Sequence, residues 1–111
     1  MPRSPDPVVL VGDLNSQPDD AAGAYGTFTA AGYVDAWVVV HGPAGGFTAG
    51  QTELLDNVPS KLDHRIDYVL YQPQDVEAVT AEVTGEELDD RTAGGLWPSD
   101  HAGVVATLVI R

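Results

Sequence analysis

The sequence predicts an α/β fold in which one main helix packs on a mixed or antiparallel sheet. An apolar run near the N-terminus is followed by a segment with helical spacing, which predicts one strand and then one helix. The β-rich segments come mainly after that helix, and two of them close the chain. This order of elements favours an α/β class over an all-helical or all-β one.

The first predicted strand is Val8–Val11, a continuous apolar run that indicates a buried strand and ends at Gly12-Asp13. The predicted helix spans Asp20–Ala31, where alanine and aromatic residues recur at helical spacing. Ser16 is a candidate N-cap, and Gly32 ends the helix.

The middle of the chain is less regular. Tyr33–Val40 is rich in strand-forming residues, although Asp35–Trp37 is also compatible with a helix. His41–Gly46 has the composition of a loop, and Phe47–Thr48 fits a short strand. Thr52–Leu62 is a polar connection.

The second half contains the clearest strand patterns. Ile66–Tyr71 is the strongest of them, because β-branched and aromatic residues dominate it. Val76–Val83 alternates with a period of two, which predicts a strand with one dry face. Thr84–Trp97 is a predicted loop, and Val104–Ile110 is the last strand.

Composition places the chain among globular proteins. It has 111 residues, 43% of them hydrophobic and 20% charged, which fits one domain over residues 8–111 after a flexible tail over residues 1–7. The absence of cysteine excludes disulfides and thiolate metal sites. The longest apolar run, Ala36–Val40, is too short to span a bilayer. No signal peptide is evident, so the cytoplasm is the default location, and secretion stays open if the true N-terminus lies upstream.

The charge balance is strongly acidic, with 17 acidic residues against 5 basic ones and a formal net charge of −12. Such a surface repels polyphosphate, so sequence-independent DNA binding by this chain alone is not expected. A metal-binding protein, a chain adapted to high salt, and a plain solvated acidic surface are all compatible with this balance.

Three short motifs place polar side chains at the ends of predicted strands. In the first, Asp13 and Asn15 follow the strand Val8–Val11. A carboxylate that orients water and an amide that donates to an oxyanion are groups that phosphoryl transfer requires. The alternative is that Asp13-Leu14-Asn15 only forms an Asx turn that leads to the helix.

Asp67 is a charged residue inside the strongest strand segment. Charged residues are rare in buried strands unless they are paired. If the strand alternation includes Arg65, both side chains share one face and form a local ion pair. The alternative is that Asp67 is an orienting carboxylate that fixes the tautomer of a histidine.

His101 precedes the last strand and follows Ser99-Asp100. Because adjacent residues of an extended chain point to opposite sides, Asp100 is not expected to pair with His101. The geometry that we expect instead joins Asp67 to His101 across strands, with Asp100 turned toward a cation. His64 beside Asp63 is close to this region but has no assigned role.

Taken in this order, the three motifs resemble the C-terminal half of the endonuclease/exonuclease/phosphatase superfamily of metal-dependent phosphoesterases. The runs that carry the resemblance are Val9–Ser16, Leu62–Leu70 and Pro98–Leu108. The resemblance implies half of a four-layer α/β/β/α sandwich. It also implies hydrolysis of a phosphoester by in-line attack of water, with a nucleic acid, a phospholipid or a small phosphate ester as the substrate.

Roles for individual residues follow from the same resemblance. Asp13 would orient or deprotonate the attacking water and contact a metal, and Asn15 would donate to the scissile phosphate. Asp67 would hold His101, which would contact the phosphoryl oxygens. Asp100 would lie at the Mg²⁺ or Mn²⁺ site. Arg65 and Trp97 are expected to have packing or rim roles.

The chain departs from the family pattern in one respect. No segment corresponds to the first half of the family, which carries the principal metal-binding glutamate. We therefore expect weak or absent Mg²⁺ binding in the isolated chain. We also expect the chain either to be part of a longer protein or to form a homo-oligomer through an exposed sheet face. An inactive half-fold that binds a partner or a second copy is the rival hypothesis, and a salt-adapted cation-binding module is a third.

Overall fold

The computed structural model describes residues 6–20, 22–51, 55, 62–85, 87 and 90–111. Most of the predicted tail over residues 1–7 and of the polar connection over residues 52–62 therefore lies outside the described residues. In chain order the elements are β1 (Val9–Asp13), α1 (Ala24–Ala30), β2 (Val34–Asp35), α2 (Ala36–His41), β3 (Asp67–Tyr71), β4 (Val76–Thr84) and β5 (Gly103–Ile110).

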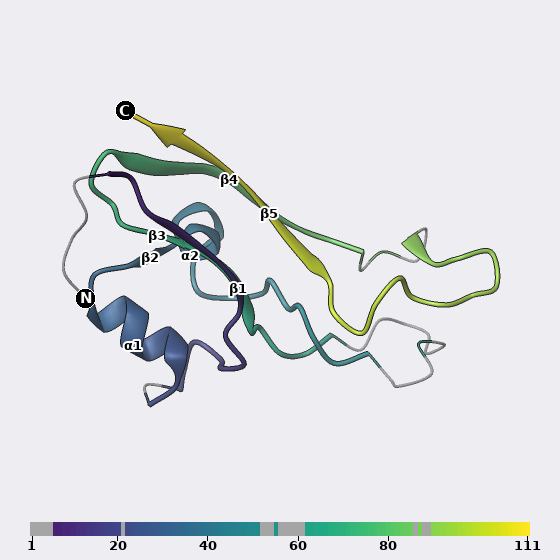
Figure 1. Cartoon of the computed structure of the whole chain (residues 1–111). Helices are drawn as coiled ribbons and strands as arrows, with labels where there is room; N and C mark the ends of the chain where they lie inside the picture. The colour runs from purple at the N-terminus through teal and green to yellow at the C-terminus, as the bar shows by residue number, and fades with distance from the viewer. Residues whose placement is uncertain (1–5, 21, 52–54, 56–61, 86, 88–89) are drawn as a thin grey trace.

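The strands form two antiparallel sheets, as Figure 1 shows. In the first sheet β3 is the middle strand, with β1 on one side and β2 on the other. In the second sheet β4 pairs with β5. The predicted α/β class with antiparallel pairing is confirmed, and the arrangement is consistent with half of an α/β sandwich.

Two clusters of apolar side chains hold the layers together. The first joins α1 to one face of the three-stranded sheet, and its buried members are Tyr25, Tyr33, Tyr68 and Leu70. The second lies on the other face, where α2 and the β4–β5 pair cover β3, and its buried members are Ala36, Tyr71, Val76 and Ala78. Helix α1 therefore lies on the opposite side of the first sheet from β4 and β5 (Figure 1).

Helix α1 is shorter than predicted, because the chain first makes a turn in which Asp20 N–H donates to the Gln17 carbonyl. The predicted N-cap role of Ser16 is wrong, since the N-cap residue of α1 is Gly23. The Ser16 hydroxyl nevertheless contacts the first turn of the helix. It accepts from the Tyr25 amide at 2.9 Å. Gly23 permits this approach, since a Cβ there would lie 2.5 Å from the Ser16 Cβ.

The predicted strand over residues 33–40 is mostly wrong, and the helical alternative at Asp35–Trp37 is confirmed. Only β2 is extended, and α2 begins directly after it. The Asp35 carboxylate accepts from the Trp37 amide at 3.0 Å, which is an N-cap for α2. The N-cap from Asp35 and the packing of α2 against β4 thus outweigh the preference of the α2 valines for a strand.

The single dry face predicted for β4 is confirmed, but the uninterrupted alternation predicted over Val76–Val83 is wrong, because a bulge shifts it by one residue. The register with β5 shifts between Ala78 and Thr80, which leaves Val79 as a bulge. The buried positions are therefore Val76 and Ala78 before the bulge and Ala81 after it. The strands over 66–71 and 104–110 are confirmed, and β3 and β5 differ from the predicted limits by one residue at their starts.

Strand β1 is present as predicted but is not buried. Among the described residues it pairs only with β3, so it is an edge strand. The layer formed by α2, β4 and β5 does not cover its outer residues, and Val11 is 66% exposed. An apolar run alone therefore did not distinguish a covered strand from an exposed edge.

Gly46 lies between α2 and the segment that carries Thr48, and its backbone conformation favours glycine. Its φ is +73°, and a Cβ there would lie 2.6 Å from the Trp37 ring. We expect Gly46→Ala to lower the free energy of unfolding by about 2–4 kcal/mol, because backbone strain and a ring clash add together. Urea unfolding measures the change.

Gly85→Ala is the matched control for this substitution. Gly85 has a φ of +88°, and a Cβ at this position would meet no other atom within 4 Å. The variant therefore reports the backbone strain alone, which is about 1–2 kcal/mol. Equal losses for the two variants would show that the contact between Gly46 and Trp37 contributes nothing.

Candidate active site

Two carboxylates face each other where β1 ends and β3 begins. Asp13 is the last residue of β1, Asp67 is the first residue of β3, and the two are directly paired in the antiparallel register. Opposed residues of an antiparallel pair project to the same face of the sheet. Two motifs that are far apart in the sequence thus place their carboxylates together.

His101 reaches this pair from the start of the last strand. Its Nδ1 lies 2.7 Å from Oδ2 of Asp67, which is the cross-strand contact expected from the sequence. The neighbouring residue is held in place as well, because the Ala102 amide donates to the Thr48 carbonyl at 2.7 Å.

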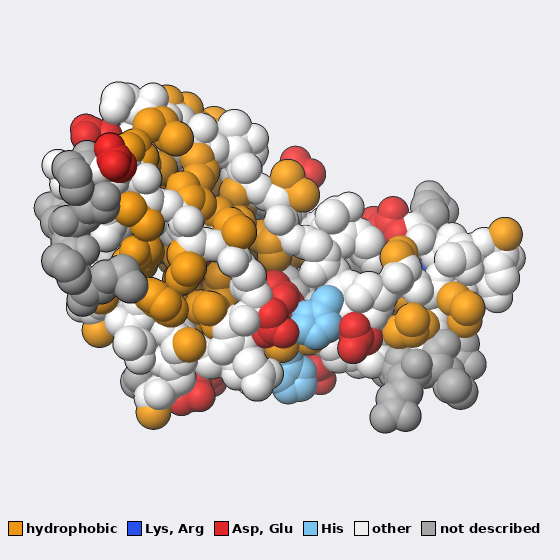
Figure 2. Space-filling model, in the orientation of Figure 1, with side chains coloured by type: hydrophobic (Ala, Val, Ile, Leu, Met, Phe, Trp, Pro, Cys, Tyr) orange, Lys and Arg blue, Asp and Glu red, His pale blue; other side chains and the backbone are white. Residues whose placement is uncertain are grey.

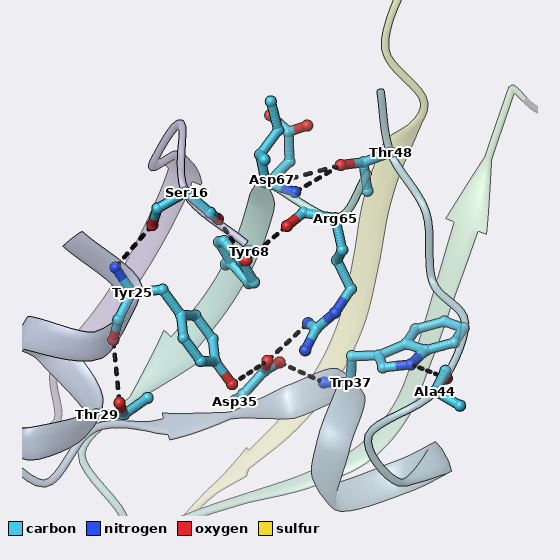
Figure 3. A network of polar contacts seen from close by, with 11 residues as sticks. Ser16, Tyr25, Thr29, Asp35, Trp37, Ala44, Thr48, Arg65, Asp67 and Tyr68 are labelled. Carbon is cyan, nitrogen blue, oxygen red and sulfur yellow. Dashed lines mark hydrogen bonds and ion pairs between the residues drawn. The ribbon is translucent and has the colours of Figure 1, made fainter. Parts of the chain in front are cut away.

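Thr48 also fixes the other side of the site. Its hydroxyl accepts from the amides of Ile66 and Asp67, both at 3.2 Å, as Figure 3 shows. Thr48 is fully buried. One residue therefore contacts both chain segments that carry the Asp67–His101 pair. The predicted short strand over Phe47–Thr48 is instead an irregular segment with isolated bridges at Ala49.

Asp13, Asp67 and His101 form a group that could hold a cation, since one potential ligand atom of each lies within 4.8 Å of the others. The two carboxylates suit a hard cation such as Mg²⁺ or Mn²⁺, whereas an imidazole suits it less well. Because Asp67 and His101 already contact each other, Asp13 is the member of the group best placed to be a ligand.

The acidic surroundings change the proton affinity of His101. The hydrogen bond that the imidazole donates to the Asp67 carboxylate raises the pKa of His101 above its ordinary value of 6.5, while partial burial opposes the change. The charges of Asp67, Asp100 and Asp13 raise the pKa further. The site therefore favours the protonated imidazole, which can donate to an anionic oxygen.

Asn15 and Asp100 lie beside this group rather than in it. The backbone N–H of Asn15 donates to Oδ1 of Asp13 at 2.7 Å. The Asx turn, which was the alternative interpretation of this motif, is therefore present. Asn15 is exposed and has a φ of +50°. Asp100 is exposed, and its carboxylate accepts from the Ser99 hydroxyl at 3.3 Å. The catalytic roles of the predicted residues stay predictions.

The local ion pair between Arg65 and Asp67 is not formed, because β3 begins at Asp67 and the strand alternation does not extend to Arg65. The guanidinium instead contacts Asp35 at 2.6 Å, with side chains only 5% and 3% exposed. The expected packing roles of Arg65 and Trp97 fit their burial, at 4% and 1% exposed.

Sequence reasoning missed the buried network around Asp35, which Figure 3 shows. Besides Arg65, the Asp35 carboxylate accepts from the Tyr25 hydroxyl at 2.9 Å. The Tyr68 hydroxyl lies 2.7 Å from the Ser16 carbonyl and 2.6 Å from the Arg65 carbonyl. An acidic residue within the apolar stretch over residues 33–40 was the available signal, since a buried carboxylate needs a partner.

An apolar surface adjoins the polar group. A groove of about 360 Å³ is lined by Val11, Val69 and Val104 together with Asp67. Figure 2 shows the same juxtaposition, with a broad hydrophobic area beside a cluster of acidic and histidine side chains. The candidate site therefore lies at the border between an acidic rim and an apolar sheet face.

The family comparison agrees with this geometry. The model of the Endonuclease/Exonuclease/phosphatase family matches residues 1–101, which is most of the chain. The chain belongs to this family, and the resemblance inferred from its three motifs is confirmed. A search of curated proteins found no match. Within the described part of the chain, the helices are too short to cross a membrane.

Proposed function

We propose that this chain contributes to the metal-dependent hydrolysis of a phosphoester by in-line attack of water, as part of a longer domain or of an assembly. The observation that carries the proposal is the convergence of Asp13, Asp67 and His101 at one sheet edge, with His101 Nδ1 held by Asp67. Membership of the Endonuclease/Exonuclease/phosphatase family supports the same reaction class.

Each residue has a distinct role in this proposal. Asp67 occupies Nδ1 of His101, so Nε2 is the nitrogen left to face the substrate. A protonated imidazole would donate from Nε2 to a phosphoryl oxygen and balance its developing charge. Asp13 would orient the attacking water, and Asn15 would donate its side-chain amide to the phosphate.

A cation completes the proposed chemistry. Asp13 would hold Mg²⁺ or Mn²⁺, with Asp100 as a second carboxylate nearby. The cation would polarise the phosphoryl group and lower the pKa of water. Because Mg²⁺ requires several oxygen ligands in near-octahedral array, we expect weak binding when few carboxylates are available.

The substrate class is a phosphoester in a nucleic acid, a phospholipid or a small molecule. The formal net charge of −12 disfavours a long polyanion as a ligand of this chain alone. The apolar groove beside Asp67 is compatible with a substrate that carries an apolar group.

Hydrolysis of bis(p-nitrophenyl) phosphate in the presence of Mg²⁺ or Mn²⁺ tests the proposal. We expect turnover that a chelator abolishes and added cation restores. Asp13→Asn should lower kcat by at least about 100-fold, because the residue orients water and binds the cation. Asp19→Asn, which changes an exposed aspartate outside the group of Asp13, Asp67 and His101, should leave kcat unchanged. Turnover that survives chelation, or survives Asp13→Asn, would contradict the proposal.

A separate observation supports the rival hypothesis, in which the chain is a self-associating module. Valines on β1 and β5 are exposed to solvent, and they are Val9, Val11, Val105 and Val109. Exposed apolar side chains on strands mark an interaction site where they gather into one surface. We expect the isolated chain to self-associate with increasing concentration and to bind an apolar dye.

Light scattering after size-exclusion chromatography measures this association. Val11→Lys should shift the equilibrium toward the monomer, because Val11 is the most exposed of these valines, at 66%. Val39→Lys, on α2 at 48% exposed, is the matched control on another surface. If the chain stayed monomeric and bound no apolar dye, the hypothesis of a self-associating module would be wrong.

A further inference from the structure

A second imidazole lies next to the candidate site on the same segment of backbone. Ala49 forms isolated antiparallel bridges with both His64 and His101. On the His64 side the two residues exchange backbone hydrogen bonds, each of 3.1 Å. Residues that are directly opposed in antiparallel bridges project to the same face. His64 and His101 therefore flank Ala49 on one face, and Figure 2 shows two histidine side chains close together among acidic ones.

His64 is oriented in the same manner as His101. Its Nδ1 contacts the carboxylate of Asp63, just as Nδ1 of His101 contacts Asp67. This contact leaves Nε2 as the free nitrogen of the ring. The His64 side chain is 51% exposed and that of Asp63 is 68% exposed, so the ring is accessible from solvent.

An anionic phosphoester needs hydrogen-bond donors, and the arginines described by the structure are engaged elsewhere. Arg65 is buried against Asp35. Arg91 donates to the Gly95 carbonyl, and Arg111 pairs with Glu77. The third histidine, His41, contacts the Ala81 carbonyl. Besides Asn15, the described side chains that can donate to the substrate are therefore His101, beside Asp67, and His64, which lies across Ala49 from His101.

We propose that His64 is a second substrate-binding residue of this site. Its Nε2–H donates to an oxygen of the phosphoester on the side away from His101, and Asp63 fixes the ring for this contact. The inference rests on the proposed function, since it concerns the same site.

Kinetics on the self-associated or complete protein provide the first test. His64→Ala should raise KM for bis(p-nitrophenyl) phosphate about tenfold and leave kcat nearly unchanged, because a hydrogen bond to a charged group is lost from substrate binding. His64→Gln should recover most of the affinity, since its amide nitrogen can replace Nε2. Asp63→Asn should give an intermediate KM.

A binding measurement that needs no turnover is the second test. Inorganic phosphate is titrated while the imidazole C–H resonances are followed by NMR. We expect the His64 and His101 resonances to shift and saturate together, with His41 as the internal control. In His64→Ala the phosphate affinity should fall about tenfold while the His101 resonance still responds.

The outcomes separate this inference from the proposed function. A phosphate response of His101 alone, or unchanged KM and phosphate affinity in His64→Ala, overturns the role of His64 and leaves the proposed function standing. Absence of hydrolysis together with no response of either histidine overturns both. If His64→Ala unfolds, the same comparisons are made with His64→Gln and Asp63→Asn.

Discussion

Replacing His101 with alanine is expected to lower kcat for bis(p-nitrophenyl) phosphate by roughly 10²–10⁴-fold, with a much smaller change in KM. The expectation follows from the contact between His101 Nδ1 and Asp67, which leaves Nε2 for the phosphoryl oxygen. Because the oxygen gains charge mainly in the transition state, a donor to it contributes to kcat rather than to ground-state binding. Steady-state kinetics with saturating Mn²⁺ measure the change.

Asp67→Asn tests whether the carboxylate acts through His101. We expect kcat to fall by about 10–100-fold, less than for His101→Ala, because the imidazole remains but is less well oriented. The pKa of His101 should fall as well, since its hydrogen bond to Asp67 is the largest cause of the rise. An NMR titration of the imidazole in the absence of divalent cations measures that pKa.

The same pKa change predicts the direction of a pH effect on stability. The folded chain raises the pKa of His101 above 6.5, so the protonated form is stabilised by folding. This contribution is fully present below about pH 6.5 and is lost as the pH rises through the folded pKa. The difference in unfolding free energy between the native chain and Asp67→Asn should therefore shrink with rising pH.

His41→Ala is the control for both variants, because His41 lies at the end of α2 and contacts a β4 carbonyl rather than the site. It should leave kcat and the pKa of His101 unchanged. Equal kcat values for His101→Ala and the native chain would exclude His101 from the chemistry. A His101 pKa that does not move in Asp67→Asn would show that the contact is too weak to orient the ring.

Much of the site could be predicted because its parts are local to short motifs. Asp13, Asp67 and His101 each stand at the end or the start of a strand, and the strands themselves have strong β patterns. Antiparallel pairing then brings the carboxylates together, which strand alternation and register already favour. The contact between Asp67 and His101 was expected across strands, but it joins the two sheets, since β3 and β5 are not paired with each other.

The features that could not be predicted depend on contacts between distant residues. The bulge in β4 arises from its register with β5. The hydrogen bond from the Tyr25 amide to the Ser16 hydroxyl depends on Gly23, which lets the two segments approach. Thr48 shows no pattern of its own, yet its hydroxyl and carbonyl join the segments of Asp67 and Ala102. Such roles appear only when the chain is folded, because no local propensity encodes them.

The partner of Arg65 shows the same limit and leads to the largest expected effect on stability. Sequence spacing suggested Asp67, which is two residues away, whereas the buried partner is Asp35. The choice is set by the start of β3 and by the cluster of Tyr25 and Tyr68, whose rings lie 5.7 and 5.0 Å from the guanidinium carbon. Burial raises the pKa of both tyrosines, so they remain neutral hydrogen-bond donors.

Asp35→Ala is expected to lower the free energy of unfolding by about 3–5 kcal/mol, because it leaves the Arg65 charge buried without a counterion. It also removes the N-cap of α2 and the acceptor for Tyr25. Asp35→Asn removes the charge but keeps a side-chain oxygen that can accept, so the difference between the two variants estimates the contribution of these hydrogen bonds to Trp37 and Tyr25. Urea unfolding measures both.

Glu77→Ala is the matched control, since it breaks an ion pair with Arg111 that is exposed rather than buried. Exposed pairs contribute at most about 1 kcal/mol, so its effect should be several times smaller. If Asp35→Ala and Glu77→Ala lowered the free energy of unfolding by similar amounts, the buried pair of Asp35 and Arg65 would not contribute more than an exposed pair. Because Arg65 precedes β3 by two residues, Asp35→Ala should also broaden the His101 imidazole resonances in the folded state, as the start of β3 loses its anchor.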